Sequence, residues 1–194
     1  MKKLAAVLVA SVVAFSCMAC GTKQNDAKKE EAKVEIADTT ELLTKAWEAV
    51  PEDSAFYVVG GDAENYVEGK PGTFNLEKAE ELGLENTMCY PLSAVEYIDS
   101  ASSLIHGMIS NGFTAGAYHL AESANAQKVV DAIKERTLGN QWMCGFPEKL
   151  MIATVGDYVV SVFGYLDNVE AFKDALSSVY GDAVVVVVDQ AIEE

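Results

Sequence analysis

The alternation of apolar runs with helical patterns in residues 112–189 is the feature that most constrains how this chain folds. In order, the segment predicts strand, helix, strand, strand, helix, strand. That order is found in the split βαβ arrangement, in which an antiparallel sheet carries both helices on one face. The coarser expectation is an α+β fold, and the more specific one is a ferredoxin-like sheet. The strands are predicted at residues 113–120, 150–154, 158–163 and 183–188, with helices starting near Ser123 and Asp167.

Two details of the second helix and the last strand extend this prediction. Asp167 and Glu170 form a D-x-x-E capping pair, and Gly181 ends the helix. The last strand, 183–188, is six apolar residues in a row. Such a run is typical of a strand that is buried on both faces, so Val186 is expected to be buried. The inward face of the second helix is predicted to consist of Val169, Phe172, Leu176 and Val179.

The part of the chain before residue 112 is less regular. Asp38 and Glu41 predict the capped start of an amphipathic helix that ends at Pro51. Residues 84–111 give no clear pattern of helix or strand. Between these regions, the sequence predicts a strand at 55–59, a polar loop at 62–73 and a small helix at 75–82 that Gly83 ends.

The first 19 residues have the pattern of a bacterial export signal. Met1 is followed by two lysines, and residues 4–15 form an almost unbroken apolar run. A helix needs about 20 residues to cross a bilayer, so this shorter run predicts the core of a signal peptide. The sequence Ser-Cys-Met-Ala-Cys-Gly at residues 16–21 then resembles the lipobox of bacterial lipoproteins. The resemblance implies cleavage between Ala19 and Cys20, with a lipid attached to the Cys20 thiol.

The lipobox resemblance leaves alternatives open. A typical lipobox has leucine three residues before the lipidated cysteine, where this chain has Cys17. Cys17 itself is the weaker candidate for lipidation because bulky Phe15 lies two residues before it. Ordinary cleavage after Ala19 leaves a soluble secreted protein instead. The main expectation is a protein on the outer face of the cell membrane, held in the lipid bilayer through acylated Cys20.

Residues 20–33 are expected to be a lipidated, disordered tether, because they contain no aromatic residue and no apolar periodicity. Residues 34–194 are then long enough for a single α+β domain. No internal repeat with a period of about 20–50 residues is visible, so a solenoid is not expected.

A strong acidic excess excludes two classes of partner. After residue 19 the chain carries 12 basic and 30 acidic side chains, a net charge of −18, and Arg136 is its one arginine. Nucleic-acid binding needs a basic surface that neutralises phosphates, and this chain has none. Electrostatic docking onto anionic lipid is excluded for the same reason.

A set of short motifs occurs between residues 93 and 176: Glu135-Arg136, Gln141-Trp142, Pro147 and Gly156-Asp157-Tyr158-Val159-Val160. This set resembles the closing half of a family of functionally uncharacterised lipoproteins from Gram-positive, clostridia-like bacteria. In that family, a lipobox and a polar tether precede one small α+β domain of unknown function. The resemblance implies a location at the cell envelope and this fold class, and it implies no activity and no functional residue.

Histidine and cysteine side chains are few. His106 and His119 have no second ligand at a metal-binding spacing, so both are interpreted as structural or surface residues, and no metal or other cofactor is expected. Cys89 and Cys144 are the only thiols after the tether. In an exported protein they suggest one disulfide, while their apolar neighbours also suit two buried free thiols. A nucleophilic pair of Cys89 with His119 is a third interpretation.

Two further groups of residues have competing interpretations. Asp62, Glu64 and Asn65 follow two glycines, as in a calcium loop, but the twelfth position holds Thr73 in place of the required glutamate. A solvated acidic turn is therefore expected there. Aromatic side chains either line a groove for a small molecule or carbohydrate or fill the core. The aromatic residues concerned are Trp47, Trp142, Phe146 and Tyr158.

No catalytic residue emerges from these patterns. The leading interpretation is a non-enzymatic extracytoplasmic domain that binds or scaffolds a protein or ligand at the cell envelope. The alternatives are an envelope enzyme whose Cys/His site is assembled from distant residues, and a small solute-binding lipoprotein.

Overall fold

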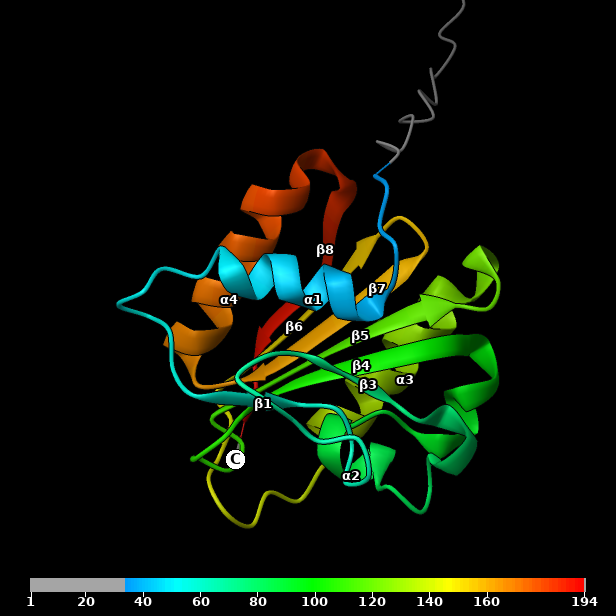
Figure 1. Ribbon diagram of the computed structural model, residues 1–194. Coiled ribbons are helices and arrows are strands. Elements are labelled where there is room, and N and C mark those ends of the chain that lie inside the picture. The colour runs from blue at the N-terminus through cyan, green and yellow to red at the C-terminus, as the bar shows by residue number, and fades with distance from the viewer. Residues whose placement is uncertain (1–33, 194) are drawn as a thin grey trace, which may run out of the picture. The chain divides into compact units, whose positions relative to one another are not determined.

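The computed structural model describes residues 34–193, which fold around one antiparallel β-sheet (Figure 1). Within these residues the sheet has eight strands, so the predicted α+β class is confirmed. The strands are β1 (Val58–Gly60), β2 (Val67–Glu68), β3 (Gly72–Phe74), β4 (Ile98–His106), β5 (Phe113–Leu120), β6 (Lys149–Val155), β7 (Tyr158–Gly164) and β8 (Val184–Ala191). The α-helices are α1 (Thr39–Glu48), α2 (Leu84–Met88), α3 (Ala126–Leu138) and α4 (Leu166–Tyr180).

The strand order is β2-β1-β4-β5-β7-β6-β8, with β3 also paired to β4. β1 pairs with residues 104–106 of β4, and β3 pairs with residues 101–103 on the same edge. These two short strands therefore resemble one strand that is interrupted by residues 61–71. Inside this interruption β2 folds back and pairs with β1, which places β2 at one border of the sheet.

Two glycines allow the chain to enter and leave this interruption at one point. A Cβ atom on Gly60 would lie 2.3 Å from the backbone nitrogen of Gly72, a distance that no side chain tolerates. Gly60 and Gly72 thus mark a point where two backbone segments cross. The predicted loop at 62–73 is wrong in part, because it contains β2 and the start of β3.

Helices cover both faces of the sheet, so the expected arrangement with both helices on one face is wrong (Figure 1). Phe172 of α4 and Leu42 of α1 belong to one core cluster, whereas Ile133 of α3 belongs to the other. On β5, Ala117 lies in the first cluster and the adjacent Tyr118 in the second. Because neighbouring strand residues point to opposite faces, the two clusters lie on opposite sides of the sheet.

The ferredoxin-like arrangement expected for residues 112–189 is also wrong. In a ferredoxin-like sheet the last strand lies beside the first, but here β8 pairs with β6 and forms the second border of the sheet. The strands predicted at 113–120, 150–154 and 158–163 are confirmed as β5, β6 and β7. A local pattern thus identified the elements without fixing their order.

The expectation that the last strand is buried on both faces is wrong for its central valines. Val185, Val186 and Val187 are 50%, 40% and 44% exposed. β8 is an edge strand, and its register with β6 shifts between Val186 and Val188. The bulge at Val187 and the missing outer neighbour leave this apolar run accessible to solvent.

The capping prediction for α4 is wrong, although the helix itself is confirmed. α4 starts at Leu166, whose N–H donates to Oε2 of Glu148 at 2.7 Å. Glu170, the expected partner of Asp167, instead forms an ion pair with Lys149. Val169, Phe172 and Leu176 are buried as predicted, whereas Val179 is exposed.

The helix predicted after Asp38 is confirmed as α1. The Asp38 carboxylate accepts a hydrogen bond from the N–H of Glu41 at 2.7 Å, and the Glu41 carboxylate accepts one from the N–H of Ala37. This reciprocal pair satisfies N–H groups at the helix start that have no partner within the helix.

The segments that gave weaker signals differ more from expectation. The strand predicted at 55–59 is the later and shorter β1, and the small helix predicted at 75–82 is reduced to a 3₁₀ turn at Leu76–Lys78. Residues 84–111, which gave no clear pattern, contain α2, a 3₁₀ helix at Leu92–Tyr97 and β4.

Residues 34–193 contain a complete core of their own. Both core clusters and all the paired strands consist of residues from this part of the chain. We therefore treat residues 34–194 as a domain that folds by itself. Among its described helices, none has both the length and the apolar character required to span a bilayer.

Candidate functional site

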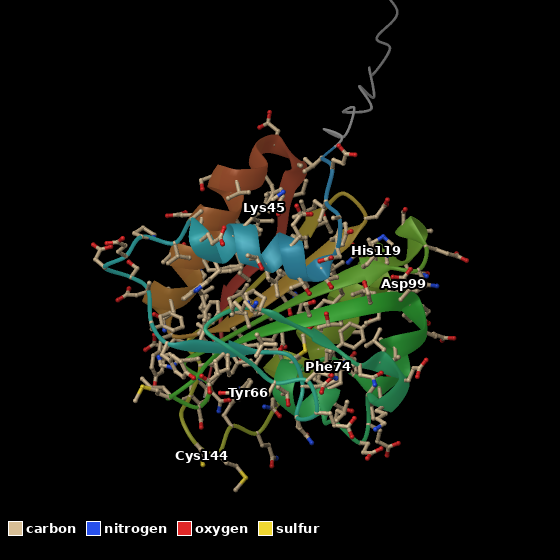
Figure 2. The ribbon with its side chains drawn as sticks, viewed as in Figure 1. Lys45, Tyr66, Phe74, Asp99, His119 and Cys144 are labelled. Carbon is tan, nitrogen blue, oxygen red and sulfur yellow. The ribbon has the colours of Figure 1, made fainter. Side chains whose placement is uncertain are left out.

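The structure offers two distinct surfaces at opposite ends of the sheet, one polar and one apolar. The polar surface centres on Asp99 of β4 and His119 of β5, which lie side by side in Figure 2. The Nδ1 atom of His119 lies 2.6 Å from Oδ1 of Asp99, and the imidazole ring packs edge-on against Tyr158 at 4.8 Å. A carboxylate at Nδ1 orients the ring and leaves Nε2 as its second polar atom.

Hydroxyl groups from three elements meet on the same face of the sheet as His119. The Ser102 hydroxyl on β4 lies 2.8 Å from the Thr39 hydroxyl and 2.7 Å from the Thr40 hydroxyl, both at the start of α1. Thr40 in turn lies 3.2 Å from the Thr73 hydroxyl on β3. Since Ser102 is fully buried, this network ties α1 to the sheet and is primarily structural.

An open groove of about 590 Å³ lies beside the Asp99 carboxylate. Its floor mixes polar and apolar groups and suits a ligand that forms a few hydrogen bonds. His119 is not among the residues that line it. Among residues 34–193, no hydroxyl or thiol forms a hydrogen bond with His119, so the pair has no assembled nucleophile. The groove is lined by residues that include Asn65, Val67, Thr73, Phe74, Asp99 and Ser100.

The two cysteines lie in different environments and are both free thiols. Cys89 is buried in the core cluster beneath α3, and burial raises the pKa of its thiol to about 11. Cys144 is exposed in the loop between α3 and β6. The disulfide considered from the sequence is not formed in this structure, and the alternative of two buried thiols holds for Cys89 alone.

The structure does not bring Cys89 and His119 together. Cys89 packs in the cluster that contains Tyr118, whereas His119 lies on the opposite face of β5 against Tyr158. A thiol with a raised pKa is also a poor source of thiolate at neutral pH. The Cys/His interpretation is therefore wrong for this pair.

His106 has a structural environment. Its Nδ1 atom accepts hydrogen bonds from the N–H groups of Met108 and Ile109, both at 3.2 Å. Its ring stacks on Phe56 at 4.5 Å, and burial lowers its pKa. The neutral ring thus closes the turn after β4.

The acidic turn at Asp62 is organised around a buried carboxylate, so the expectation of a solvated turn is wrong for this residue. Asp62 is 5% exposed, and its oxygens accept hydrogen bonds from the N–H groups of Glu64, Asn65 and Asn75 and from the side-chain amide of Asn65. Burial acts to raise the pKa of Asp62, but these hydrogen bonds together outweigh it and lower the pKa. Glu64 at the surface pairs with Lys78 at 2.8 Å.

The four aromatic residues considered for a groove do not line a common one. Trp47 and Tyr158 belong to the α1 face, whereas Trp142 and Phe146 pack against the cluster on the α3 face. The indole N–H of Trp142 is buried without a hydrogen-bond acceptor, an unfavourable arrangement in the loop before β6. The interpretation that these aromatics mainly fill the core agrees with this distribution.

The second surface, which we call the apolar end, was missed from the sequence. The N–H group of Gly107 donates to the carbonyl of Tyr57, and the side chain of Asn111 donates to the carbonyls of Cys144 and Gly145. Nearby, the N–H of Tyr165 donates to the carbonyl of Gly112. These contacts gather the loops 107–112 and 139–148 with the start of α4. Exposed apolar side chains there are Tyr57 (44%), Met108 (80%), Ile109 (42%), Met143 (91%) and Leu166 (48%).

Absence of charge is the signal that could have found the apolar end. Residues 107–112 and 137–147 contain no acidic or basic side chain, so Glu148 and, in the first turn of α4, Asp167 are the acids in the segments named above, whereas residues 34–193 together carry 26 acidic and 8 basic side chains. An uncharged surface loop is uncommon in such a chain. The two loops have no regular repeat of apolar residues, so hydrophobic periodicity does not mark this surface.

The apolar end lies opposite the N-terminal end of the domain. The hydroxyl of Tyr158, the first residue of β7, donates to the carbonyl of Ile36, while Gly164 at the other end of β7 accepts from the N–H of Glu148. Seven strand residues separate these points by about 20 Å. Figure 2 accordingly shows Cys144 far from His119 and Asp99.

Cys20 and the other residues of the predicted signal and tether lie outside the described residues. In the part of the chain that the structure covers, no group of three or more histidine, cysteine, aspartate or glutamate side chains is placed to hold a metal ion. Comparison of the chain with known protein families, curated proteins and solved structures finds no match.

Proposed function

We propose that this protein is a lipid-anchored extracytoplasmic binding or scaffold domain that presents its apolar end to a protein partner at the cell envelope. The single observation that carries the proposal is the apolar end itself, where hydrogen bonds hold together the segments that carry five exposed apolar side chains, in an otherwise acidic domain. Contiguous exposed apolar surface on a soluble fold marks interaction sites. Methionine side chains adapt to partners of irregular shape, which suits Met108 and Met143 to this role.

The position of the apolar end supports a membrane anchor at the other end of the domain. A chain attached to lipid through Cys20 leads to residue 34, and Ile36 lies about one strand length from the apolar end. Such an attachment leaves the apolar loops free to meet a partner that projects from the envelope. The lipobox-like sequence at residues 16–21 supports the anchor independently of the fold.

Photo-cross-linking in cells tests the partner. A photoreactive residue at position 143 should give one discrete adduct, while the same residue at exposed position 135 on α3 should give none. Met108→Glu should abolish the adduct at 143 because a charge on the apolar end opposes the burial of this surface against a partner. Adducts at 135 that match those at 143, or an adduct that persists with Met108→Glu, would contradict the proposal.

The anchor has a separate test. Cys20→Ala should move the protein out of the membrane fraction or stall its processing, and should end labelling by radioactive palmitate. Cys17→Ala is the matched control and should leave both unchanged. Lipid labelling that persists in Cys20→Ala would show that the anchor is elsewhere.

A further inference from the structure

The β8 border of the sheet has an unpaired side along its whole length. β8 is eight residues long and pairs with β6 on one side, and no other described strand contacts its other side. An edge strand of this length presents a row of backbone N–H and C=O groups that can pair with another strand.

The first five side chains of β8, residues 184–188, are valines and lie on both faces of the sheet. Val186 is paired with Ala153, so it points toward the α4 face, while Val185 is paired with Thr154 and points to the α3 face. Val187 occupies the bulge between them. A strand added here buries valines on both of its faces, as in the interior of a sheet.

Charge distinguishes this border from the rest of the domain. Lys149 and Lys173 each form ion pairs with both Glu170 and Asp189, so these four charges beside β8 cancel. The exposed acids Asp182 and Glu193 lie outside the strand, beyond its two ends. The remaining described residues include 6 basic and 24 acidic side chains. Two copies of so acidic a domain repel each other in most orientations, and approach through a locally neutral border is the least opposed.

We propose that two copies of this protein pair antiparallel through β8 and join their sheets into one continuous sheet. A strand that pairs antiparallel with its own copy forms a two-fold symmetric interface in which the same residues face each other. With Val186 opposite Val186 of the second copy, residues 184–188 of each copy face the same five valines. This register places Asp189 opposite Ala183, so no acid faces another acid.

The proposal rests on the edge strand and does not depend on the partner proposed for the apolar end. It adds a consequence for that surface, because a dimer carries two apolar ends on one assembly. Two linked sites bind a multivalent partner more tightly than one site does, without any new contact.

Sedimentation velocity of residues 34–194 tests the pairing. At rising protein concentration the wild-type domain should shift from the monomer mass to twice that mass. Val185→Lys should remain monomeric over the same range, because it places a cation in the neutral strip of the border. Glu68→Lys on β2, the matched control at the other border, should dimerise like the wild type.

Salt gives a second readout that separates this interface from a charge-driven one. Sodium chloride screens the repulsion between acidic copies, so the dimer fraction should rise with salt. Circular dichroism of each variant checks that it is folded. A wild-type domain that stays monomeric at every concentration, a Val185→Lys variant that still dimerises, or a dimer that salt dissociates would each overturn the proposal.

Discussion

The β2 border of the sheet consists of a two-residue strand that carries Glu68, whereas the β8 border is eight residues long and exposes three consecutive valines. β2 belongs to an excursion of the chain that is held by the buried Asp62 carboxylate and by the Gly60–Gly72 crossing. β8 is held by its pairing with β6 and by the ion pairs of Lys149 and Lys173.

The two borders differ in how well they are protected against pairing with a strand of another chain. Short edge strands with charged flanks resist pairing with another chain, and Glu68 together with Lys70 and Pro71 gives the β2 border both features. Residues 184–188 of β8 contain neither proline nor charge. The β2 border is thus protected against pairing with another chain, while the β8 border remains available for such pairing.

The largest expected effect comes from a pair of substitutions within β8. Val188 is buried on the α3 face, so Val188→Asp should lower the free energy of unfolding by at least about 3 kcal/mol, since an unpaired charge is buried. Val186→Asp should cost about 1 kcal/mol because its side chain reaches solvent. Urea unfolding measures both, and equal losses would contradict the assignment of β8 as an exposed edge.

At the β2 border, Gly60→Ala should be strongly destabilising although it adds only one methyl group. The added methyl group would overlap the backbone of Gly72, Lys70 and Pro71, and relieving that overlap should cost about 3 kcal/mol. Gly139→Ala is the control, because its nearest atom is the Glu135 carbonyl oxygen at 3.1 Å, and it should cost less than about 1 kcal/mol. A Gly60→Ala domain that melts like the wild type would show that the two chain segments do not cross there.

Asp62→Ala should lower the free energy of unfolding by about 2 kcal/mol, because it removes the acceptor of hydrogen bonds from three backbone N–H groups. Asp62→Asn keeps one oxygen and should lose less. Glu64→Ala is the surface control and should change stability by less than about 0.5 kcal/mol. Thermal unfolding of the three variants measures the order, and a Glu64→Ala loss as large as that of Asp62→Ala would contradict the buried role of Asp62.

The dependence of stability on acid pH compares the carboxylates at the two borders. Asp62, Glu170 and Asp189 all have lowered pKa values in the folded domain, so each stabilises it fully above the pKa of the unfolded chain. That stabilisation is lost as the pH falls through the folded pKa, below about pH 4. A hydrogen bond from Lys149 is the main cause of the lowered pKa of Glu170 and of Asp189. For Asp62, the hydrogen bonds within its turn lower the pKa against the opposing effect of burial.

Substitution separates these contributions. Asp62→Asn should reduce the loss of stability between pH 7 and pH 3 more than Glu170→Gln does. The reason is that the Glu170 side chain is about a third exposed, so water screens its ion pairs. Urea midpoints between pH 7 and pH 3 measure the slopes. A steeper change from Glu170→Gln would show that the β8 border, not the β2 border, depends more on its carboxylates.

The second half of the fold was predictable because its signals are local. β5, β6, β7 and the buried positions Val169, Phe172 and Leu176 of α4 follow from apolar periods of two and 3.6 within single segments. The order of those strands was not predictable, because β8 pairs with β6 through contacts that no local pattern encodes. The same limit explains β8, since a run of valines fits a doubly buried strand and an exposed edge equally well.

The candidate surfaces were less predictable than the fold. Asp99 and His119 are 20 residues apart and meet because β4 and β5 pair, so neither residue carries a signal by itself. Asp62 was interpreted as solvated because acidic turns usually are, and only the surrounding N–H groups show its role. The apolar end required attention to missing charge in two loops that the sequence separates by more than 20 residues.

The smallest expected effect is a change in melting temperature when lysine is introduced at each of the two borders. Val185 and Glu68 are both exposed, so Val185→Lys and Glu68→Lys should each change the stability of the monomer by less than about 0.5 kcal/mol. If β8 pairs with its copy, the wild-type melting temperature rises with protein concentration, because dimer formation stabilises the folded state by mass action. Glu68→Lys should keep this dependence, and Val185→Lys should remove it. A melting temperature that depends on concentration to the same degree in both variants would show that the two borders are equivalent in self-association, and that the exposed valines of β8 do not mediate it.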